Sequence, residues 1–383
     1  MTLLFERKVD GPATHAFVIG VGSYPLAKPN NTRGIASLKQ VPDLPSAADS
    51  AMFMTDWLLA NKDNFASKLS SLEVLISDAE ETLNRYGWKH KPVDGATHDT
   101  VMAAGNNWLE RLAIRPGDTA FFYCCGHGAR VSARPVLFLE DLNSDKTNPW
   151  KHLDVGHLAN SLKQFTHIKC AFLFSDACSE YIPKLEVASA QETRFFTAYD
   201  PYQTDDDKVS FLCAAPAASL TYDGPVPNKD GLKLGRFTQV LVKALGGASV
   251  RWWENGWPVY PSSLQDDLKI IRKVYFQGWD NLPFAHSVQL TQNECYPILY
   301  PTKPYVPVLI STDPETSLPQ FDLHVSQSGS QSYLASRPRA AEVWHLDLEP
   351  SKNTFVSIAD DGTNQKTATF TPDRPIINQR ILV

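Results

Sequence analysis

The sequence predicts a three-layer α/β sandwich, with helices on both faces of a mostly parallel sheet, followed by a small all-β domain. Two observations indicate this fold. Over most of the chain, short and strongly apolar runs alternate with helical patterns. From about residue 304, proline-rich segments with strand-like alternation replace that pattern. We therefore expect one domain over residues 1–303 and a second over residues 304–383.

Five apolar runs rich in β-forming residues are expected to be the strands of the sheet. Runs of this length with few polar residues are typical of strands that are buried on both faces, as in parallel sheets. The long connections between them suit right-handed crossovers. The five runs cover residues 15–21, 71–77, 119–125, 168–174 and 209–214.

The segments between these runs carry apolar residues at helical spacing. Pro45 suits the first turn of one helix, and Val101, Trp108 and Leu112 lie on one side of another that starts near Thr100. Further helices are expected over residues 155–165, 237–245 and 263–276, and a hairpin strand over 135–139. In the C-terminal domain, the alternations Phe321-Leu323-Val325 and Trp344-Leu346-Leu348 predict strands.

Composition and charge exclude several classes of protein. With 43% hydrophobic and 20% charged residues, the chain is neither disordered nor a coiled coil. A formal net charge of −6 gives no overall attraction to nucleic acids or acidic membranes, so we expect neither as a partner. No apolar run approaches the roughly 18 residues of a membrane span. The first ten residues lack the apolar stretch of a secretory signal, so a cytoplasmic location is expected.

Two expected strand ends carry reactive side chains. In open parallel sheets, functional groups gather beyond the carboxyl ends of the strands. The third strand is followed by His127, which has a glycine on each side, and the fourth is followed by Cys178. An imidazole there suits a general acid or base, and a thiolate beside it suits a nucleophile. Of the six cysteines, two are adjacent and most lie in apolar runs, so no disulfide framework is expected, and without a CxxC pair structural zinc is not expected either.

Several segments together resemble the caspase/metacaspase superfamily of cysteine peptidases. They are, in order, HAFVIGVGSYP, LPSAADSA, FFYCCGHGAR, CAFLFSDACSE, FLCAAPAAS and GRFTQVLVKAL, spread over roughly residues 12–300. As in caspases, the histidine precedes the cysteine by about 50 residues. The resemblance implies a caspase-like fold, with Cys178 as the nucleophile and His127 as the acid/base. It also implies that the backbone N–H groups of Gly128 and Cys178 stabilise the oxyanion.

The residues before the cysteine depart from the caspase pattern. Caspases have Gln-Ala-Cys, whereas Asp176-Ala177-Cys178 is nearer the Asp-x-Cys of metacaspases and clostripain-like peptidases. Residues i and i+2 of a strand share a side, so Asp176 is expected beside Cys178 and would favour Arg or Lys before the scissile bond, as the resemblance also implies. A structural hydrogen bond from Asp176 to loop backbone is the alternative.

The rest of the predicted pocket for the substrate residue before the scissile bond also departs from the family pattern. Metacaspases carry a glutamine and an acidic residue where Ala217 and Thr221 stand in this chain, and Asp223 is a candidate substitute. No cofactor or metal is expected, although many metacaspases need calcium and the run Asp205-Asp206-Asp207 offers carboxylates for it. A solvated acidic loop is the simpler interpretation of that run.

The predicted function is that of a cysteine endopeptidase, which cleaves proteins or peptides after Arg or Lys through a thioester on Cys178. Residues 179–208 stand where caspase-like enzymes are often cut, so activation by self-processing or by another protease is a hypothesis. We expect a monomer. Two alternatives are a catalytically silent caspase-like module that binds protein partners and a transpeptidase that uses the same thioester.

Overall fold

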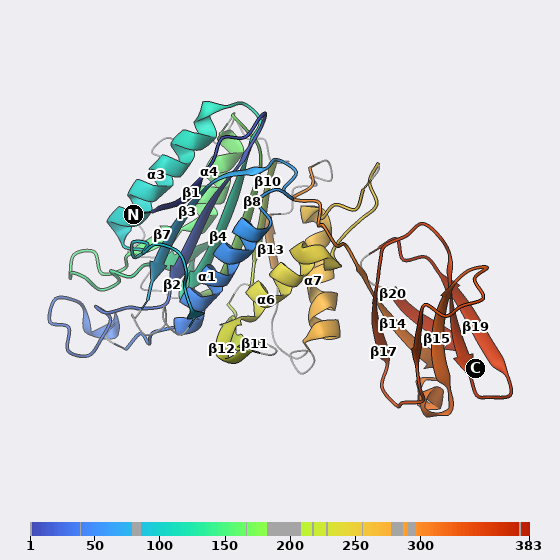
Figure 1. The fold of residues 1–383 in the computed structure, drawn as a ribbon. Coiled ribbons are helices and arrows are strands. Elements are labelled where there is room, and N and C mark those ends of the chain that lie inside the picture. Colours follow the sequence, from blue (N-terminus) through green and yellow to red (C-terminus); the bar gives the residue numbers. More distant parts are fainter. Residues whose placement is uncertain are drawn as a thin grey trace. The chain divides into compact units, whose positions relative to one another are not determined.

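In the computed structural model, the chain forms two compact units. They are Met1–Val242 with Leu282–Tyr296, and Lys243–Asn281 with Pro297–Val383 (Figure 1). Each unit is described by itself. The structure describes residues 2–38, 40–78, 86–165, 167–181, 208–216, 218–226, 229–254, 256–276, 286–289, 296–374 and 377–383.

A seven-stranded, mostly parallel sheet forms the centre of the first unit, in the order β1-β3-β2-β4-β8-β10-β13. Its five inner strands are parallel and confirm the five predicted strands. The two edge strands, which were not predicted, pair antiparallel. The strands are β1 (Leu3–Glu6), β2 (Thr14–Val21), β3 (Leu69–Ser77), β4 (Asp118–Gly126), β8 (Ile168–Ala177), β10 (Val209–Cys213) and β13 (His286–Gln289).

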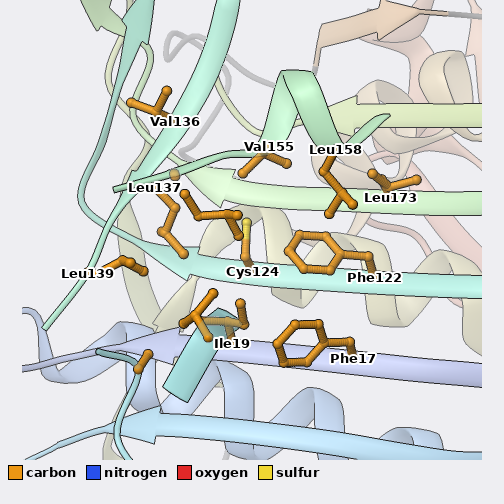
Figure 2. Packing of buried hydrophobic residues seen from close by; sticks show 14 of the residues in the cluster. Phe17, Ile19, Phe122, Cys124, Val136, Leu137, Leu139, Val155, Leu158 and Leu173 are labelled. Carbon is orange, nitrogen blue, oxygen red and sulfur yellow. The ribbon is translucent and has the colours of Figure 1, made fainter. Parts of the chain in front are cut away.

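Helices cover both faces of this sheet (Figure 1). On one face, apolar side chains of α3 and α4 pack into one core with Phe17, Phe122 and Leu173 (Figure 2). On the other face α1 approaches so closely that a Cβ at Gly20 would overlap Ala51. Because alternate residues of a strand face opposite ways, Phe17 and Gly20 mark the two faces of β2. The predicted helices are observed as α1 (Pro45–Ala60), α3 (His98–Ile114), α4 (Val155–Gln164) and α6 (Arg236–Lys243).

Smaller strands adjoin the carboxyl ends of the inner strands. The predicted hairpin strand is β6, which belongs to a four-stranded sheet of order β7-β6-β5-β9. A separate hairpin, β11-β12, precedes α6. These elements are β5 (Gly128–Val131), β6 (Arg134–Phe138), β7 (His152–Asp154), β9 (Glu180–Tyr181), β11 (Asp223–Val226) and β12 (Lys229–Gly235).

The second unit contains α7 (Pro261–Tyr275) and two small β-sheets. The sheets have the orders β17-β14-β20 and β16-β15-β18-β19, and their inward residues form one core that includes Val308, Leu323 and Phe355. The two strands predicted from alternation are observed as β15 and β17. The strands are β14 (Val306–Asp313), β15 (Asp322–Gln327), β16 (Ala335–Arg337), β17 (Trp344–Leu348), β18 (Phe355–Asp360), β19 (Gln365–Phe370) and β20 (Ile377–Leu382). Within the described ranges, no helix has the length and apolar character to cross a membrane.

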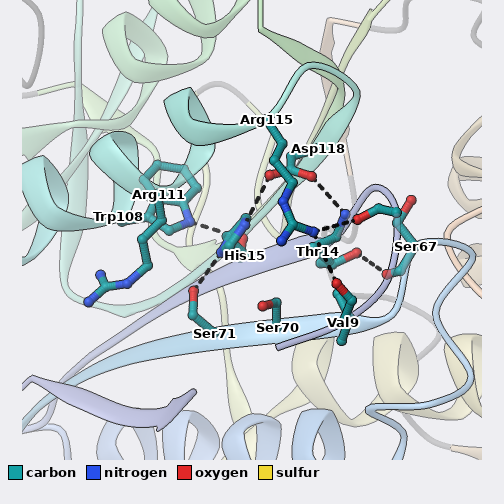
Figure 3. A network of polar contacts seen from close by, with 12 residues as sticks. Val9, Thr14, His15, Ser67, Ser70, Ser71, Trp108, Arg111, Arg115 and Asp118 are labelled. Carbon is teal, nitrogen blue, oxygen red and sulfur yellow. Dashed lines mark hydrogen bonds and ion pairs between the residues drawn. The ribbon is translucent and has the colours of Figure 1, made fainter. Parts of the chain in front are cut away.

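A buried polar network ties the amino ends of β2, β3 and β4 together (Figure 3). The His15 ring lies between Ser71 and Asp118, with Nδ1 2.7 Å from Ser71 Oγ and Nε2 3.2 Å from Asp118 Oδ2. The other Asp118 oxygen accepts the N–H of Ala13 at 2.7 Å, and Trp108 Nε1 donates to the His15 carbonyl at 2.9 Å. Burial lowers the pKa of His15 below its ordinary value, although Asp118 opposes this shift.

This lowered pKa predicts a pH dependence of stability. The unfolded chain binds a proton at His15 near pH 6.5 and the folded chain only at lower pH, so stability decreases as pH falls below about 6.5. Urea unfolding at pH 7 and at pH 5.5 measures this dependence. We expect the wild type to lose more stability between these two pH values than His15→Gln loses. An equal loss in both proteins would contradict this assignment.

Candidate active site

Two neighbouring parallel strands place the predicted catalytic pair side by side. Gly126 of β4 and Ala177 of β8 are register partners, and His127 and Cys178 directly follow them. Adjacent strands run about 4.8 Å apart, so the two residues emerge next to each other at the carboxyl edge of the sheet. Both are partly exposed, whereas the strand residues before them are buried. A substrate therefore has access to both side chains.

The fourth strand is longer than predicted. The expected end was residue 174, but β8 continues to Ala177 because Ser175, Asp176 and Ala177 keep pairing with β4. The polar residues Ser175 and Asp176 predict a loop there. In the structure, contacts with other elements satisfy the hydrogen-bonding groups of these side chains within the sheet. Asp176 therefore lies in the strand, and only Cys178 lies beyond its end.

The imidazole of His127 is held from two sides. Its Nε2 lies 3.1 Å from the carbonyl oxygen of Pro42, and because that oxygen can only accept, Nε2 carries the proton in this contact. The backbone N–H of His127 donates to Tyr24 Oη at 2.9 Å, and the two rings lie 5.2 Å apart. The Pro42 contact thus fixes the orientation of the ring.

The loop that supplies Pro42 and Tyr24 is closed by its own hydrogen bonds. The N–H of Leu44 donates to the Gly22 carbonyl at 2.8 Å, and the N–H of Tyr24 donates to Asp43 Oδ1 at 2.8 Å. Partial burial acts to raise the pKa of Asp43, but hydrogen bonds from Lys28 and the Tyr24 N–H outweigh it and lower the pKa. An ionised Asp43 thus keeps both ends of the loop against His127.

Cys178 differs from the other cysteines in the part of the chain that the structure describes. It is partly exposed, and the backbone N–H of Thr221 points at its Sγ from 3.5 Å, which favours a thiolate. The others are buried, and burial raises the pKa of Cys124 to about 12 and that of Cys170 to about 11. Burial likewise raises the pKa values of Cys125 and Cys213. These four thiols stay protonated at neutral pH, so Cys178 is the suitable nucleophile among the five.

Gly128 lies against the backbone of Cys178. A Cβ at Gly128 would come within 2.8 Å of the Cys178 carbonyl oxygen and 2.7 Å of the Val136 carbonyl oxygen. Only glycine fits between these two backbone segments. The two residues expected to stabilise the oxyanion are therefore in direct backbone proximity.

Asp176 is buried, with 1% of its surface exposed. Its Oδ2 accepts from the backbone N–H of Thr238 at 3.1 Å and from Thr238 Oγ1 at 2.6 Å, and its Oδ1 accepts from Thr221 Oγ1 at 3.0 Å. Burial raises its pKa, although these hydrogen bonds oppose the shift. The alternative role for Asp176 was a structural hydrogen bond to loop backbone. The structure shows such a bond, but to the backbone of the first turn of α6.

The surroundings of Asp176 also reach the nucleophile. Thr221 donates its hydroxyl to Asp176 and its N–H to Cys178, so one residue contacts both. The charge of Asp223 raises the pKa of Asp176 further, which places a second carboxylate nearby. Gly235 packs over the carboxylate so closely that a Cβ there would overlap it.

Sequence reasoning missed two residues that orient His127. Tyr24 stands in the quoted segment HAFVIGVGSYP, so its position after the first strand was an available signal. Pro42 acts through its backbone carbonyl, which no side-chain pattern reveals.

Some sequence predictions fall outside the described residues. Ala217, the acidic run Asp205-Asp206-Asp207 and most of the expected cleavage segment belong to this group. Among the residues that the structure does describe, no three His, Cys, Asp or Glu side chains form a group that could hold a metal.

Comparison with known proteins supplies no family for this chain. No protein-family model matches it, and no curated protein matches it either. Its chemistry is therefore inferred from the arrangement of His127, Cys178 and the residues around them.

Removing the Tyr24 hydroxyl tests the orientation of the imidazole. Tyr24 is fully buried, so Tyr24→Phe keeps the ring but leaves the His127 N–H without its acceptor. An unpaired buried group costs about 1–3 kcal/mol, and we expect a fall in kcat of roughly 5-fold or more with KM little changed. Steady-state kinetics with an arginyl peptide measure kcat and KM separately. An unchanged kcat would show that Tyr24 only fills space.

Proposed function

We propose that this protein is a cysteine endopeptidase of the caspase/metacaspase type that cleaves after Arg or Lys, and that its α/β unit is a caspase-like sandwich. One observation carries the proposal. His127 and Cys178 follow register partners at the ends of two adjacent parallel strands, and the Pro42 carbonyl fixes the proton on His127 Nε2. A base, a nucleophile and a group that orients the base are the elements of nucleophilic acyl transfer.

The chemistry assigns one role to each residue. The thiolate of Cys178 attacks the scissile carbonyl carbon, and the backbone N–H groups of Gly128 and Cys178 stabilise the resulting oxyanion. His127, which took the proton of the Cys178 thiol on Nδ1, passes that proton to the leaving amine as the C–N bond breaks, which leaves a thioester on Cys178. Water, deprotonated by His127, then attacks the thioester, and the carboxylic acid product leaves as the thiol is restored.

The preference for a basic residue rests on the carboxylates near Cys178. Asp176 contacts Thr221, and Thr221 in turn contacts Cys178. Asp223 adds a second negative charge nearby. A guanidinium or ammonium group before the scissile bond would be attracted to this region, whereas an aspartate there would be repelled.

A panel of fluorogenic peptides that differ only in the residue before the scissile bond tests this proposal. With Arg, Lys, Asp and Leu peptides, with and without calcium, we expect cleavage after Arg and Lys only. Cleavage after Asp alone would overturn the basic preference. No cleavage of any peptide, together with no labelling of Cys178 by a peptidyl electrophile, would overturn the assignment as a peptidase. Adding a peptide amine as a competing acceptor shows whether hydrolysis or transpeptidation prevails.

A further inference from the structure

A second candidate site lies at the other end of β4 from His127. Here a cavity of about 460 Å³ opens beside His15, Asp118 and Arg115, near the network of Figure 3. Its volume is within the range of small-molecule sites. Asp118 begins β4, a strand of 9 residues that ends just before His127, so the cavity is roughly 25–30 Å from the proposed active site. A ligand in this cavity could not contact the scissile bond.

Cationic side chains gather around the cavity although the protein as a whole is acidic. Four cationic side chains line it, those of Arg7, Lys8, Arg111 and Arg115, against the carboxylates Glu6 and Asp118. The net charge of the whole chain is −6. Cationic side chains attract anions where carboxylates do not already neutralise them.

Two of these cations already have carboxylate partners. Arg111 pairs with the buried Glu73 at 2.6 Å and with Glu6 at 3.2 Å. Arg7 pairs with Asp63 at 2.7 Å. Their charges are therefore largely balanced within the protein.

Within the described ranges, the other two cations, Lys8 and Arg115, have no such carboxylate partner. Arg115 is nevertheless held in place, because its Nη1 donates to the carbonyls of Val9 at 3.0 Å and Gly11 at 2.9 Å. A guanidinium held by backbone loses little freedom when a ligand binds, and its remaining N–H groups suit the paired oxygens of a phosphate.

The polar network beneath the cavity offers no accessible nucleophile. Ser71, His15 and Asp118 are hydrogen-bonded in a row, but Ser71 contacts Nδ1 and Asp118 contacts Nε2, the reverse of a serine hydrolase, and Ser71 is fully buried, so no substrate can reach its hydroxyl. Both Asp118 oxygens have partners, the N–H of Ala13 and the ring of His15. This carboxylate is 1% exposed, so an anion in the cavity would not contact it directly.

A neighbouring cavity extends the basic region. It measures about 570 Å³, shares Arg7 and Lys8 with the first, and adds Lys68 and Lys169, with Asp10 and Asp63 as its acidic residues. The two cavities thus meet at Lys8. Positive charge that continues past one cavity suits a ligand with more than one anionic group.

We propose that this paired cavity binds a small molecule that carries at least two phosphate groups, with Lys8 and Arg115 as its main ligands. Ammonium and guanidinium groups are the side chains that recognise phosphate. The proposal is independent of the peptidase activity, since binding is measured without a peptide substrate.

Calorimetric titration of the full chain with pyrophosphate, at constant low ionic strength, tests the site. Wild-type protein should bind, and Lys8→Gln and Arg115→Gln should each weaken binding about 5-fold or more, the loss of one charge-assisted contact. Lys89→Gln, which removes an exposed lysine after β3, is the matched control and should bind as the wild type does.

Three results would overturn the site. They are no binding by the wild type at millimolar pyrophosphate, unchanged binding in Lys8→Gln, and equal weakening in Lys89→Gln, which would indicate nonspecific attraction. If Arg115→Gln unfolds because it loses its bonds to Val9 and Gly11, Lys8→Gln decides, since the Lys8 side chain is exposed.

Discussion

Cys178→Ala is expected to reduce hydrolysis of arginyl and lysyl peptides to background, a loss on the order of 10⁴-fold or more in kcat. The thioester cannot form without the sulfur. His127→Ala should lower kcat by about 10²–10⁴-fold, because the leaving amine then departs unprotonated. If the two residues act as one unit, the double variant should be little slower than the worse single variant.

Cys170→Ala is the matched control for these substitutions. Cys170 lies at the amino end of β8 and is also a free thiol, but it is buried and its pKa is raised to about 11. Removing it should lower stability through lost packing and leave kcat/KM nearly unchanged. Activity of Cys178→Ala within tenfold of the wild type would contradict the assigned nucleophile.

Asp176→Asn is expected to reduce the preference for Arg over Leu by about 30-fold or more, the effect of removing one partner of a largely desolvated charge pair. Asparagine keeps the size of the side chain and one acceptor for Thr238, so the fold should persist with a loss of about 1 kcal/mol at the start of α6. The ratio of kcat/KM for matched Arg and Leu peptides measures the preference.

The two roles of Asp176 predict different outcomes. If it serves only as a cap for α6, Asp176→Asn lowers the melting temperature and leaves the Arg/Leu ratio unchanged. The raised pKa supplies a second test, because attraction to Arg needs the ionised carboxylate. The Arg/Leu ratio should fall as pH decreases through a pKa above 3.8, and this fall should be absent in Asp176→Asn.

The sequence was most informative where burial is most complete. The five inner strands are buried on both faces, so apolar composition alone predicted them. Parallel topology then predicted that His127 and Cys178 lie at one edge. The edge strand β1 was missed because it is short and only partly buried, so its pattern is weak.

Tertiary contacts explain the remaining differences. β8 extends through Asp176 because Thr238, far along the chain, satisfies the carboxylate. Pro42 orients His127 through a backbone atom, and the basic cavity combines Lys8 with Arg115, which lie far apart in sequence. No local pattern encodes any of these contacts.

Trapping with a peptidyl-arginine chloromethyl ketone tests the central claim most directly, because the adduct identifies both the nucleophile and the preferred residue. Mass spectrometry of the digested protein should place one equivalent on Cys178, with no adduct in Cys178→Ala and slower labelling in His127→Ala. The matched aspartyl reagent should label far more slowly. An adduct on another cysteine, or equal labelling by both reagents, would contradict the account.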